Sequence, residues 1–387
     1  MSIREFYKGK TILLTGTTGF IGKVILEKMI REFDFKRIYV MLRPKKTATV
    51  EERLKKEVFS SEIFSFLQKQ KPQKFIEEAK AKIKPIAGDL IIDKLGLSAE
   101  DRAELVSELD VIINCAASVN FDDPLLDAIQ INYFGCLRVL KLAKECVKLE
   151  CLCHVSTAYV NSDKQGLIEE KIYTLNRDPE EIIREILQMN PQYIIDNEKT
   201  LIGRYPNTYT YTKSMAERAL LKTHGHVRVA LIRPSVVISS YEQPYPGWTD
   251  TLAAAGGIIF GVTSGLMHVV FASPSNCLDI VPCDYVSNTT LCATAYTARL
   301  NKPQVLVCHS SSTHHNPCSI QVIADNITAY AQKFPYYRAF SEAWAYPTGN
   351  PALFHSLIFF TETIPSKLFE WKSKMPVLGS AEQREQS

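Results

Sequence analysis

The sequence predicts an α/β protein built on a doubly wound parallel sheet. Two observations support this prediction. Short apolar runs rich in β-branched residues alternate with helical patterns over residues 1–240, and a glycine-rich turn follows the first of these runs. Apolar strands that are separated by helices lie in a parallel sheet with both faces covered. Right-handed crossovers between such strands place helices on both sides of the sheet.

The expected strands and helices alternate along the chain. The strands are apolar runs bounded by polar or turn-forming residues, and they cover residues 10–15, 37–42, 83–87, 110–114, 152–156 and 227–232. Helical patterns cover residues 19–33, 99–107, 124–148 and 209–223. A late apolar run at 304–309 predicts that the C-terminal part returns a strand to the main sheet.

Two insertions interrupt the alternation. Residues 45–82 are rich in Lys and Glu and carry an apolar stripe, so we expect surface helices there; the stripe is Leu54, Val58, Phe64, Leu67 and Phe75. In the second insertion, 163–206, an acidic run at 178–181 opens a helical pattern. From residue 241 onward the alternation fades. We expect a first domain over 1–240 that carries both insertions, a smaller second region over 241–345 and a further segment over 346–387.

The composition excludes several classes of protein. Hydrophobic residues make up 46% and charged residues 22%, which argues against disordered, collagen-like and coiled-coil chains. A net charge of +3 predicts no general affinity for nucleic acid. The 10 cysteines include no C-x-x-C pair, so we expect reduced thiols in an intracellular compartment. His309, His314 and His315 have no carboxylate at ligand spacing, which favours a polar loop over a metal site.

One apolar stretch, 251–271, is long enough to suggest a transmembrane helix. It contains Gly256, Gly257, Gly261 and Gly265, which lower its helix propensity. We therefore expect a buried helix and loop. The N-terminus has no apolar segment of the kind found in secretory signals.

The glycine-rich turn predicts a dinucleotide site of the Rossmann type. Gly16, Gly19 and Gly22 follow the first strand in the spacing G-x-x-G-x-x-G and open a helix. Gly16 permits a tight turn, Gly19 lets the backbone approach a pyrophosphate, and Gly22 allows close helix–strand packing. The expected contacts come from Thr15, Gly16, Thr18, Gly19, Phe20, Ile21 and Gly22.

The residues after the next strands favour one form of the cofactor. An NAD site usually carries an acidic residue after the second strand, whereas Arg43 stands there. Arg43 could pair bidentately with a 2′-phosphate, which predicts NADPH; the alternative is a solvated basic loop. Asp89, after the third strand, could accept a hydrogen bond from the adenine amino group. Further expected contacts are Leu90, Asn114, Ala116 and Ala117.

A tyrosine and a lysine predict a reducing centre. Tyr209 and Lys213 share one helix face at i, i+4 spacing. A nearby ammonium lowers the pKa of a phenol, which would make Tyr209 a catalyst near neutral pH. Ser156 and Thr157, at the end of the fifth strand, could bind a carbonyl oxygen. The alternative is an ordinary aromatic–lysine pair on a helix.

Two further residues, Tyr211 and Asn132, could have either a catalytic or a structural role. Tyr211 is a rival phenol, but the residue four positions later is Met215. Asn132 could hold a water that relays protons to Lys213, or it could be a plain helix amide.

These segments resemble the extended short-chain dehydrogenase/reductases and, more narrowly, the fatty acyl-CoA reductases that form alcohols. The resemblance rests on residues 15–22, 152–160 (LCHVSTAYV), 206–217 (PNTYTYTKSMAE), 232–236 (IRPSV) and 279–286 (DIVPCDYV). It covers residues 8–345, with both insertions where the family has them. It also implies cofactor contacts from Arg233 and Pro234.

The resemblance implies NADPH-dependent reduction of a long-chain fatty acyl-CoA to a primary alcohol and free CoA, for ether-lipid or wax synthesis. A first hydride gives a hemithioacetal that loses CoA, and a second reduces the aldehyde. Tyr209 would donate the proton, Lys213 would tune it and bind the ribose, and Thr157 with Ser156 would bind the oxygen. No covalent cysteine is required.

The family also implies a setting for the chain. Its members usually continue into a helical C-terminal domain, often with a membrane anchor, so 346–387 would be a truncated start of that domain. The implied location is a cytosol-facing membrane of the peroxisome or endoplasmic reticulum. Alternative functions are another extended reductase, of the hydroxysteroid dehydrogenase or nucleotide-sugar epimerase type, and a weak NADP-binding sensor.

Overall fold

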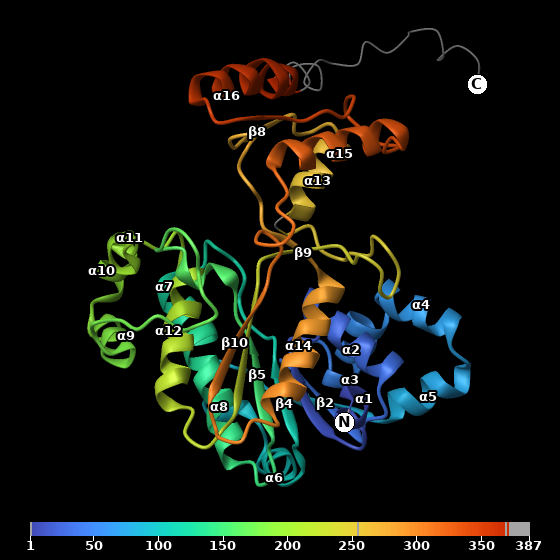
Figure 1. Ribbon diagram of the computed structural model, residues 1–387, viewed down its shortest axis with the longest axis vertical. Helices are drawn as coiled ribbons and strands as arrows, with labels where there is room; N and C mark the ends of the chain where they lie inside the picture. The colour runs from blue at the N-terminus through green and yellow to red at the C-terminus, as the bar shows by residue number, and fades with distance from the viewer. Residues whose placement is uncertain (1, 254, 368–369, 371–387) are drawn as a thin grey trace, which may run out of the picture. The chain divides into compact units, whose positions relative to one another are not determined.

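Seven parallel strands form the central sheet, in the order β10-β6-β5-β4-β1-β2-β3 (Figure 1). They are β1 Thr11–Thr15, β2 Arg37–Leu42, β3 Ile83–Ala87, β4 Val111–Asn114, β5 Cys151–Val155, β6 Val229–Pro234 and β10 Val305–Ser310. The strand order reverses between β1 and β4, which confirms the doubly wound α/β fold. The pairing of β10 with β6 confirms that a late strand returns to the main sheet.

The computed structural model describes residues 2–253, 255–367 and 370, and the chain divides into two compact units. The first unit is Met1–Thr251 with Ile280–Ser312, and the second is Leu252–Asp279 with Thr313–Ser387. These boundaries differ from the expected ones at 240 and 345. The segment after 280 stays in the first unit because β9 (Ile280–Pro282) pairs with β7 (Val236–Ile238).

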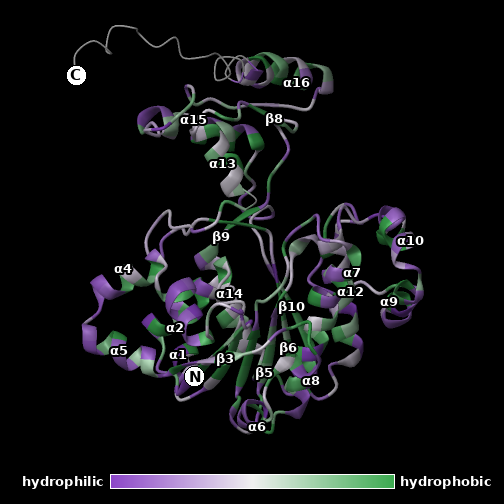
Figure 2. Ribbon diagram, turned by 180° about the vertical axis from the view of Figure 1, so that it is seen from behind, coloured by the Kyte–Doolittle hydropathy of each residue, from purple (hydrophilic) through white to green (hydrophobic). Residues whose placement is uncertain are grey.

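Two apolar layers cover the sheet, because successive strand residues point to opposite faces. Leu14 of β1 belongs to one layer, with α2 (Phe20–Glu32), α14 (Cys283–Thr297) and the short α1 (Ile3–Tyr7). Leu13 belongs to the other, with α6 (Ala99–Glu108), α8 (Gly135–Glu145) and α12 (Thr208–Thr223). Figure 2 shows hydrophobic residues along the strands of the sheet. Cys151 and Cys153 are among the buried residues of the first layer.

The helix expected over 124–148 is not regular throughout. It begins as α7 (Leu125–Ala128), widens into a π-helical segment, η3 (Ile129–Phe134), and continues as α8. Turns of π-helix are rare in proteins, and many of those that occur lie at functional sites. Asn132 lies inside this one.

Both insertions are helical. The first contains α3 (Val50–Arg53), π-helical η1 (Leu54–Phe59), α4 (Glu62–Gln70) and α5 (Gln73–Ala81). Its apolar stripe packs into the core: Leu54, Val58, Phe64 and Leu67 are buried and Phe75 is partly buried. The second contains α9 (Pro179–Gln188), α10 (Pro191–Asp196) and α11 (Glu198–Ile202), and Asp178 caps α9.

The second unit contains α13 (Ala255–Thr263), β8 (Val269–Phe271), α15 (Ile320–Lys333), β11 (Tyr346–Thr348), α16 (Pro351–Ile358) and η5 (Phe359–Thr363). The expectation of a helix and loop at 251–271 is confirmed, but the expected burial holds only in part. The helix α13 spans nine residues, and Ile258, Ile259 and Phe260 on it are exposed. The helix ends before Gly265, whose φ of +69° a helix cannot continue. Within the described ranges, no helix has the length and hydrophobicity that a membrane crossing requires.

Candidate active site

The glycine-rich turn lies between β1 and α2, beside the point where the strand order reverses. Gly16 has a φ of +74°, and a Cβ there would lie 2.7 Å from the backbone nitrogen of Ala116. A Cβ at Gly22 would lie 2.8 Å from Cα of Thr17. The tight turn and the close packing expected of Gly16 and Gly22 are therefore both present, and larger residues would force the turn apart.

The same turn fits the phosphates of a dinucleotide. Gly19 is the N-cap of α2 and supplies no side-chain hydrogen bond to its first turn. Free N–H groups at a helix N-terminus favour an anion. Thr17 is fully buried, and its hydroxyl has no partner among the described residues, which leaves a polar group that a ligand could satisfy.

The other residues of the turn differ in how much of each side chain a ligand could contact. The ring of Phe20 stacks on Trp248, with centroids 5.4 Å apart, so Phe20 can offer a ligand its backbone N–H but not a free ring. Thr18 and Ile21 are partly exposed beside it. Thr17, which was not among the expected contacts, is buried, as are Thr15 and Gly22.

A row of hydrogen bonds joins the ends of β1, β4 and β5. Thr15 donates to Asn114 Oδ1 at 2.6 Å and accepts from the backbone N–H of Ala116 at 3.1 Å. Asn114 Nδ2 donates to His154 Nδ1 at 3.0 Å. An amide NH₂ only donates, so Nδ1 accepts and the imidazole proton lies on Nε2. Thr15 and Asn114 thus fix the strand ends around the turn, and Ala117 follows as a small, partly buried residue.

His154 was not among the residues expected at this site. It is fully buried, and desolvation, with a smaller contribution from Lys213, holds its pKa well below the usual value, so the ring is neutral. A histidine in an otherwise apolar strand, in register with an asparagine of the next strand, is the signal that could have identified it.

Arg43 and Asp89, predicted to bind the two sides of the adenosine, pair with each other. Arg43 Nε lies 3.2 Å from Asp89 Oδ2. Asp89 Oδ1 also accepts from the backbone N–H of Ile91 at 3.1 Å. Leu90 is buried, and its side chain lies against Gly135 of α8.

Tyr209 lies where the reducing centre was expected, but its acidity does not follow the prediction. The phenol makes a hydrogen bond with Thr157, and its ring lies 5.7 Å from that of Phe121. Burial raises the pKa of Tyr209 to about 12, and the Thr157 hydrogen bond only partly opposes this. The predicted lowering by Lys213 is wrong in this structure, because desolvation by burial is the largest influence on this phenol and raises its pKa.

Lys213 and Ser156 complete this group. Lys213 Nζ donates to the backbone oxygen of Val155 at 2.8 Å, and burial lowers the pKa of its ammonium. Ser156 is buried, and its hydroxyl has no partner among the described residues. The phenol of Tyr209, the hydroxyls of Ser156 and Thr157 and the buried ammonium of Lys213 therefore meet where β5 ends and α12 begins.

Asn132 was expected either to hold a proton-relaying water for Lys213 or to be a plain helix amide. Its Oδ1 accepts from the N–H of Ser118 at 3.0 Å, and Nδ2 donates to the oxygen of Ser118 at 3.2 Å and to Thr212 at 3.3 Å. Both ends of the amide hold neighbouring elements, which favours the structural alternative.

The structure places Tyr211 and Arg233 in the protein core. Tyr211, the rival phenol, is a core residue against Tyr205. Arg233 does not fit a cofactor contact: it is fully buried, and its guanidinium binds Glu217 at 2.5 Å, the oxygen of Lys171 at 3.0 Å and His309 at 3.3 Å. These bonds use Nε, Nη2 and one N–H of Nη1, and so leave little of the guanidinium for a ligand. Pro234 ends β6 next to it.

Among the described side chains, no group of three His, Cys, Asp or Glu residues could hold a metal ion. The 10 cysteines are free thiols. Two pockets, of about 320 and 360 Å³, lie beside α9 and beside the C-terminal end of α2, and none of the candidate site residues above lines them.

Comparisons with known proteins identify a family and several relatives. A family model described as male sterility protein, an NAD-binding family, matches residues 14–290. Fatty acyl-CoA reductase 2 of Bos taurus is 34% identical over 370 residues, which cover 95% of this chain and 70% of the relative. Fatty acyl-CoA reductase 1 of Xenopus laevis is 34% identical over 96% of this chain and 71% of its own length.

Solved structures share the fold at lower identity. The terminal R domain of the myxalamid PKS-NRPS pathway has a TM-score of 0.62 and 21% identity, over 96% of this chain and 81% of that one. The reductase domain of a nonribosomal peptide synthetase from Mycobacterium tuberculosis has a TM-score of 0.62 and 18% identity, over 93% and 80%.

Proposed function

The chain belongs to the fatty acyl-CoA reductase family, and on that premise we propose that it reduces long-chain fatty acyl-CoA to a primary fatty alcohol and free CoA. The observation that carries the proposal is the group formed by Tyr209, Thr157, Ser156 and Lys213 beside the dinucleotide turn. The chain is an oxidoreductase of the extended short-chain type that uses a nicotinamide dinucleotide.

The phenol suits reduction better than oxidation. With a pKa of about 12, Tyr209 is protonated at neutral pH and can donate a proton to an oxygen that gains negative charge. Thr157 binds the phenol, and the free hydroxyl of Ser156 can donate to the same oxygen. Lys213 is fixed by Val155 within reach of the same strand end.

We assign the cofactor as NADPH, which supplies hydride when it is bound. The support is Arg43, a half-exposed guanidinium after β2 at the position where NAD-binding proteins carry an acid. The turn at Gly16 and the N-terminus of α2 would hold the pyrophosphate, and the row from Thr15 to His154 keeps the strand ends in place for it.

The thioester requires no covalent enzyme intermediate. Reduction to the alcohol takes up two hydrides and two protons and releases CoA as a thiol. Cys115, next to the turn, is an unsuitable nucleophile because burial raises the pKa of its thiol. The protons therefore come through Tyr209 at each of the two reductions.

The test is a reaction with defined stoichiometry. Purified protein is mixed with palmitoyl-CoA and NADPH, nicotinamide absorbance is followed, and the lipid product is identified by mass spectrometry. We expect two NADPH consumed per fatty alcohol and per free thiol. Tight NADPH binding without turnover of any acyl-CoA would instead identify a sensor, and turnover of a steroid or nucleotide sugar would identify another extended reductase.

We also propose that the protein works on a cytosol-facing membrane of the peroxisome or endoplasmic reticulum. Support comes from the family resemblance and from exposed aromatic side chains in the second unit, Phe359 and Phe360. Fractionation of cells that express the full chain tests this location; recovery in the cytosolic supernatant alone would contradict it.

A further inference from the structure

The ends of β2 and β3 bring Arg43 and Asp89 together by register. Leu42 pairs with Ala87, and the N–H of Gly88 donates to the oxygen of Leu42 at 3.0 Å. A Cβ at Gly88 would lie 2.7 Å from Cγ of Met41, so glycine allows β3 to turn this close to β2. The two strands therefore deliver their next side chains, one basic and one acidic, to the same place.

Asp89 is held firmly. Its Oδ1 accepts from the N–H of Ile91 at 3.1 Å, and its own N–H donates to the oxygen of Leu95 at 2.8 Å. Leu95 is fully buried in the second core layer with a φ of +65°, inside the turn η2 (Asp93–Gly96). Burial keeps this unusual backbone in place, and only Oδ2 of the carboxylate is left for Arg43.

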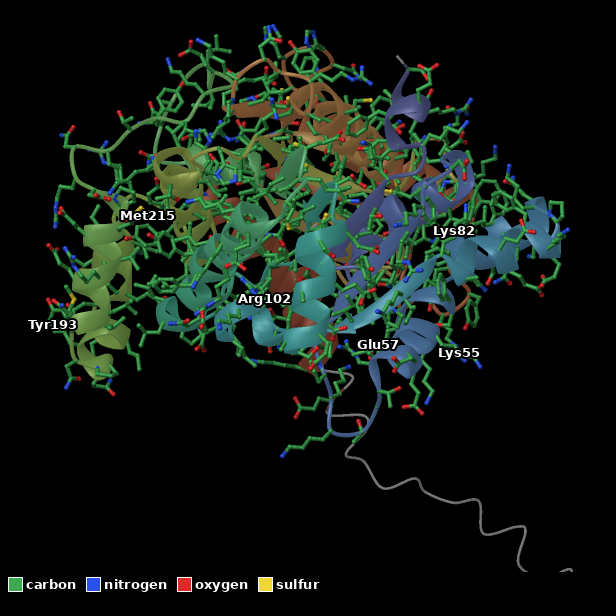
Figure 3. The ribbon with its side chains drawn as sticks, turned by 90° about the horizontal axis from the view of Figure 1, so that it is seen from below. Lys55, Glu57, Lys82, Arg102, Tyr193 and Met215 are labelled. Carbon is green, nitrogen blue, oxygen red and sulfur yellow. The ribbon has the colours of Figure 1, made fainter. Side chains whose placement is uncertain are left out.

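The backbone of Arg43 is anchored as well. The guanidinium of Arg53, a buried residue of the first insertion, donates to the backbone oxygen of Arg43. Arg53 is in turn fixed by Glu57, through Nε at 2.8 Å and Nη2 at 2.5 Å; Figure 3 labels Glu57 on this insertion. Arg53 and Lys45 hold the pKa of Glu57 down at about 2, so the carboxylate is charged.

Arg43 itself is exposed apart from this one contact. Its side chain is 59% exposed, whereas that of Asp89 is 10% exposed. The closest approach is through Nε, and the side chain of Arg43 has no second ion-pair or hydrogen-bond partner in the described ranges. A guanidinium that is held through Nε keeps both terminal amino groups for a second anion, in the fork geometry that matches a phosphate.

We propose that Asp89 is a positioning residue that aims Arg43 at the 2′-phosphate of NADPH and so determines the preference for NADPH over NADH. This inference rests on the proposed cofactor. Two other roles of Asp89 predict different results. A carboxylate that only accepts from the adenine amino group would serve NADPH and NADH equally, and a carboxylate that repels the 2′-phosphate would favour NADH.

The experiment measures dissociation constants for NADPH and NADH by fluorescence titration of the full-length protein, with adenosine 2′,5′-bisphosphate as a competitor that needs no turnover. The central variant is Asp89→Asn, because an asparagine oxygen can still accept from the N–H of Ile91 while its amide cannot pair with a guanidinium. Lys46→Ala is the matched control: it removes an exposed positive charge of the same loop that has no ion pair in the described structure. Thermal unfolding checks that each variant folds.

We expect Asp89→Asn to weaken NADPH and adenosine 2′,5′-bisphosphate about tenfold and NADH less than twofold. Lys46→Ala should weaken NADPH less than threefold. In an Arg43→Ala background, Asp89→Asn should no longer change the ratio of the two affinities, because the group it aims is absent.

Three results would overturn the inference. Equal weakening of NADPH and NADH by Asp89→Asn would assign it to the adenine alone, tighter NADPH binding would identify repulsion, and an undiminished effect in the Arg43→Ala background would remove the link between the residues. The proposed cofactor fails separately, if Arg43→Ala leaves the ratio of the two affinities unchanged.

Discussion

The reducing centre (Tyr209, Lys213, Ser156 and Thr157) and the adenosine end (Arg43 and Asp89) hold their polar groups in different ways. At the reducing centre Lys213 is 1% exposed and binds a backbone oxygen, and burial moves the pKa values of both Lys213 and Tyr209. At the adenosine end the arginine is 59% exposed and is held by one ion pair. Changes at the buried group should therefore alter rate and proton transfer, whereas changes at the exposed group should alter the choice of cofactor.

The largest effect should come from Tyr209→Phe. Losing the proton donor should lower kcat about 1000-fold while cofactor affinity changes little, because the ring and its packing remain. Tyr211→Phe, which removes the hydroxyl of a core phenol on the same helix, is the control and should retain most of the activity. Similar losses in both variants would mean that the two phenols do not differ in function, and the reducing centre would need to be reassigned. Steady-state kinetics with palmitoyl-CoA measures kcat for both variants.

The next effect concerns stability at an arginine that was expected to bind cofactor. Arg233→Met leaves Glu217 as a buried, unpaired carboxylate, and breaking such a pair costs about 3 kcal/mol of unfolding free energy. Urea denaturation measures the loss, and the double variant Arg233→Met/Glu217→Met should recover part of it. An unchanged unfolding free energy together with a loss of NADPH affinity would restore Arg233 to the cofactor site.

A smaller effect is expected at the row of hydrogen bonds. His154→Leu removes the acceptor of Asn114 Nδ2 and should lower the unfolding free energy by about 1–2 kcal/mol, with weaker binding of both cofactors alike. His154→Asn keeps an oxygen acceptor near Nδ1 and should recover part of the loss. If both variants bind NADPH and NADH as well as the parent protein does, the row has no part in shaping the turn.

The smallest expected effect is that of pH on kcat. A proton donor works below its pKa, and that of Tyr209 is about 12, so titration of this phenol should lower kcat less than twofold between pH 7 and pH 10. Loss should begin only as the pH approaches 12. A fall in kcat with a midpoint below pH 9 that persists with a slower substrate, for which the chemical step limits the rate, would contradict this prediction and would mean that the pKa of Tyr209 is lowered during the reaction.

The sequence was most informative where the signal is local. The strands, the glycine turn and the i, i+4 pair of Tyr209 and Lys213 depend on residue order alone, and the structure shows each within one or two residues of its expected bounds. The role of Arg233 depends on Glu217, sixteen residues earlier on another element, and no local pattern indicates that contact. The pKa of Tyr209 depends on burial, which spacing does not specify.

The same distinction explains the other differences. His154 is a lone polar residue in an apolar run, and only the register of β4 with β5 places it on Asn114. The helix α13 was expected to be buried because its residues are apolar, but its length and its neighbours leave one side exposed. Apolar composition predicts a preference for burial, and tertiary contacts decide whether it is met.

The position of β10 in the chain has a consequence for synthesis on the ribosome. β6 is complete at residue 234, yet the strand that covers its outer edge, 305–310, is made only after residues 252–279 of the second unit have emerged. During that interval the nascent sheet has an open, apolar edge of the kind that pairs with other chains. Messages that end early, before codon 305, should therefore yield insoluble product, and holdase chaperones should crosslink to nascent chains halted within that interval.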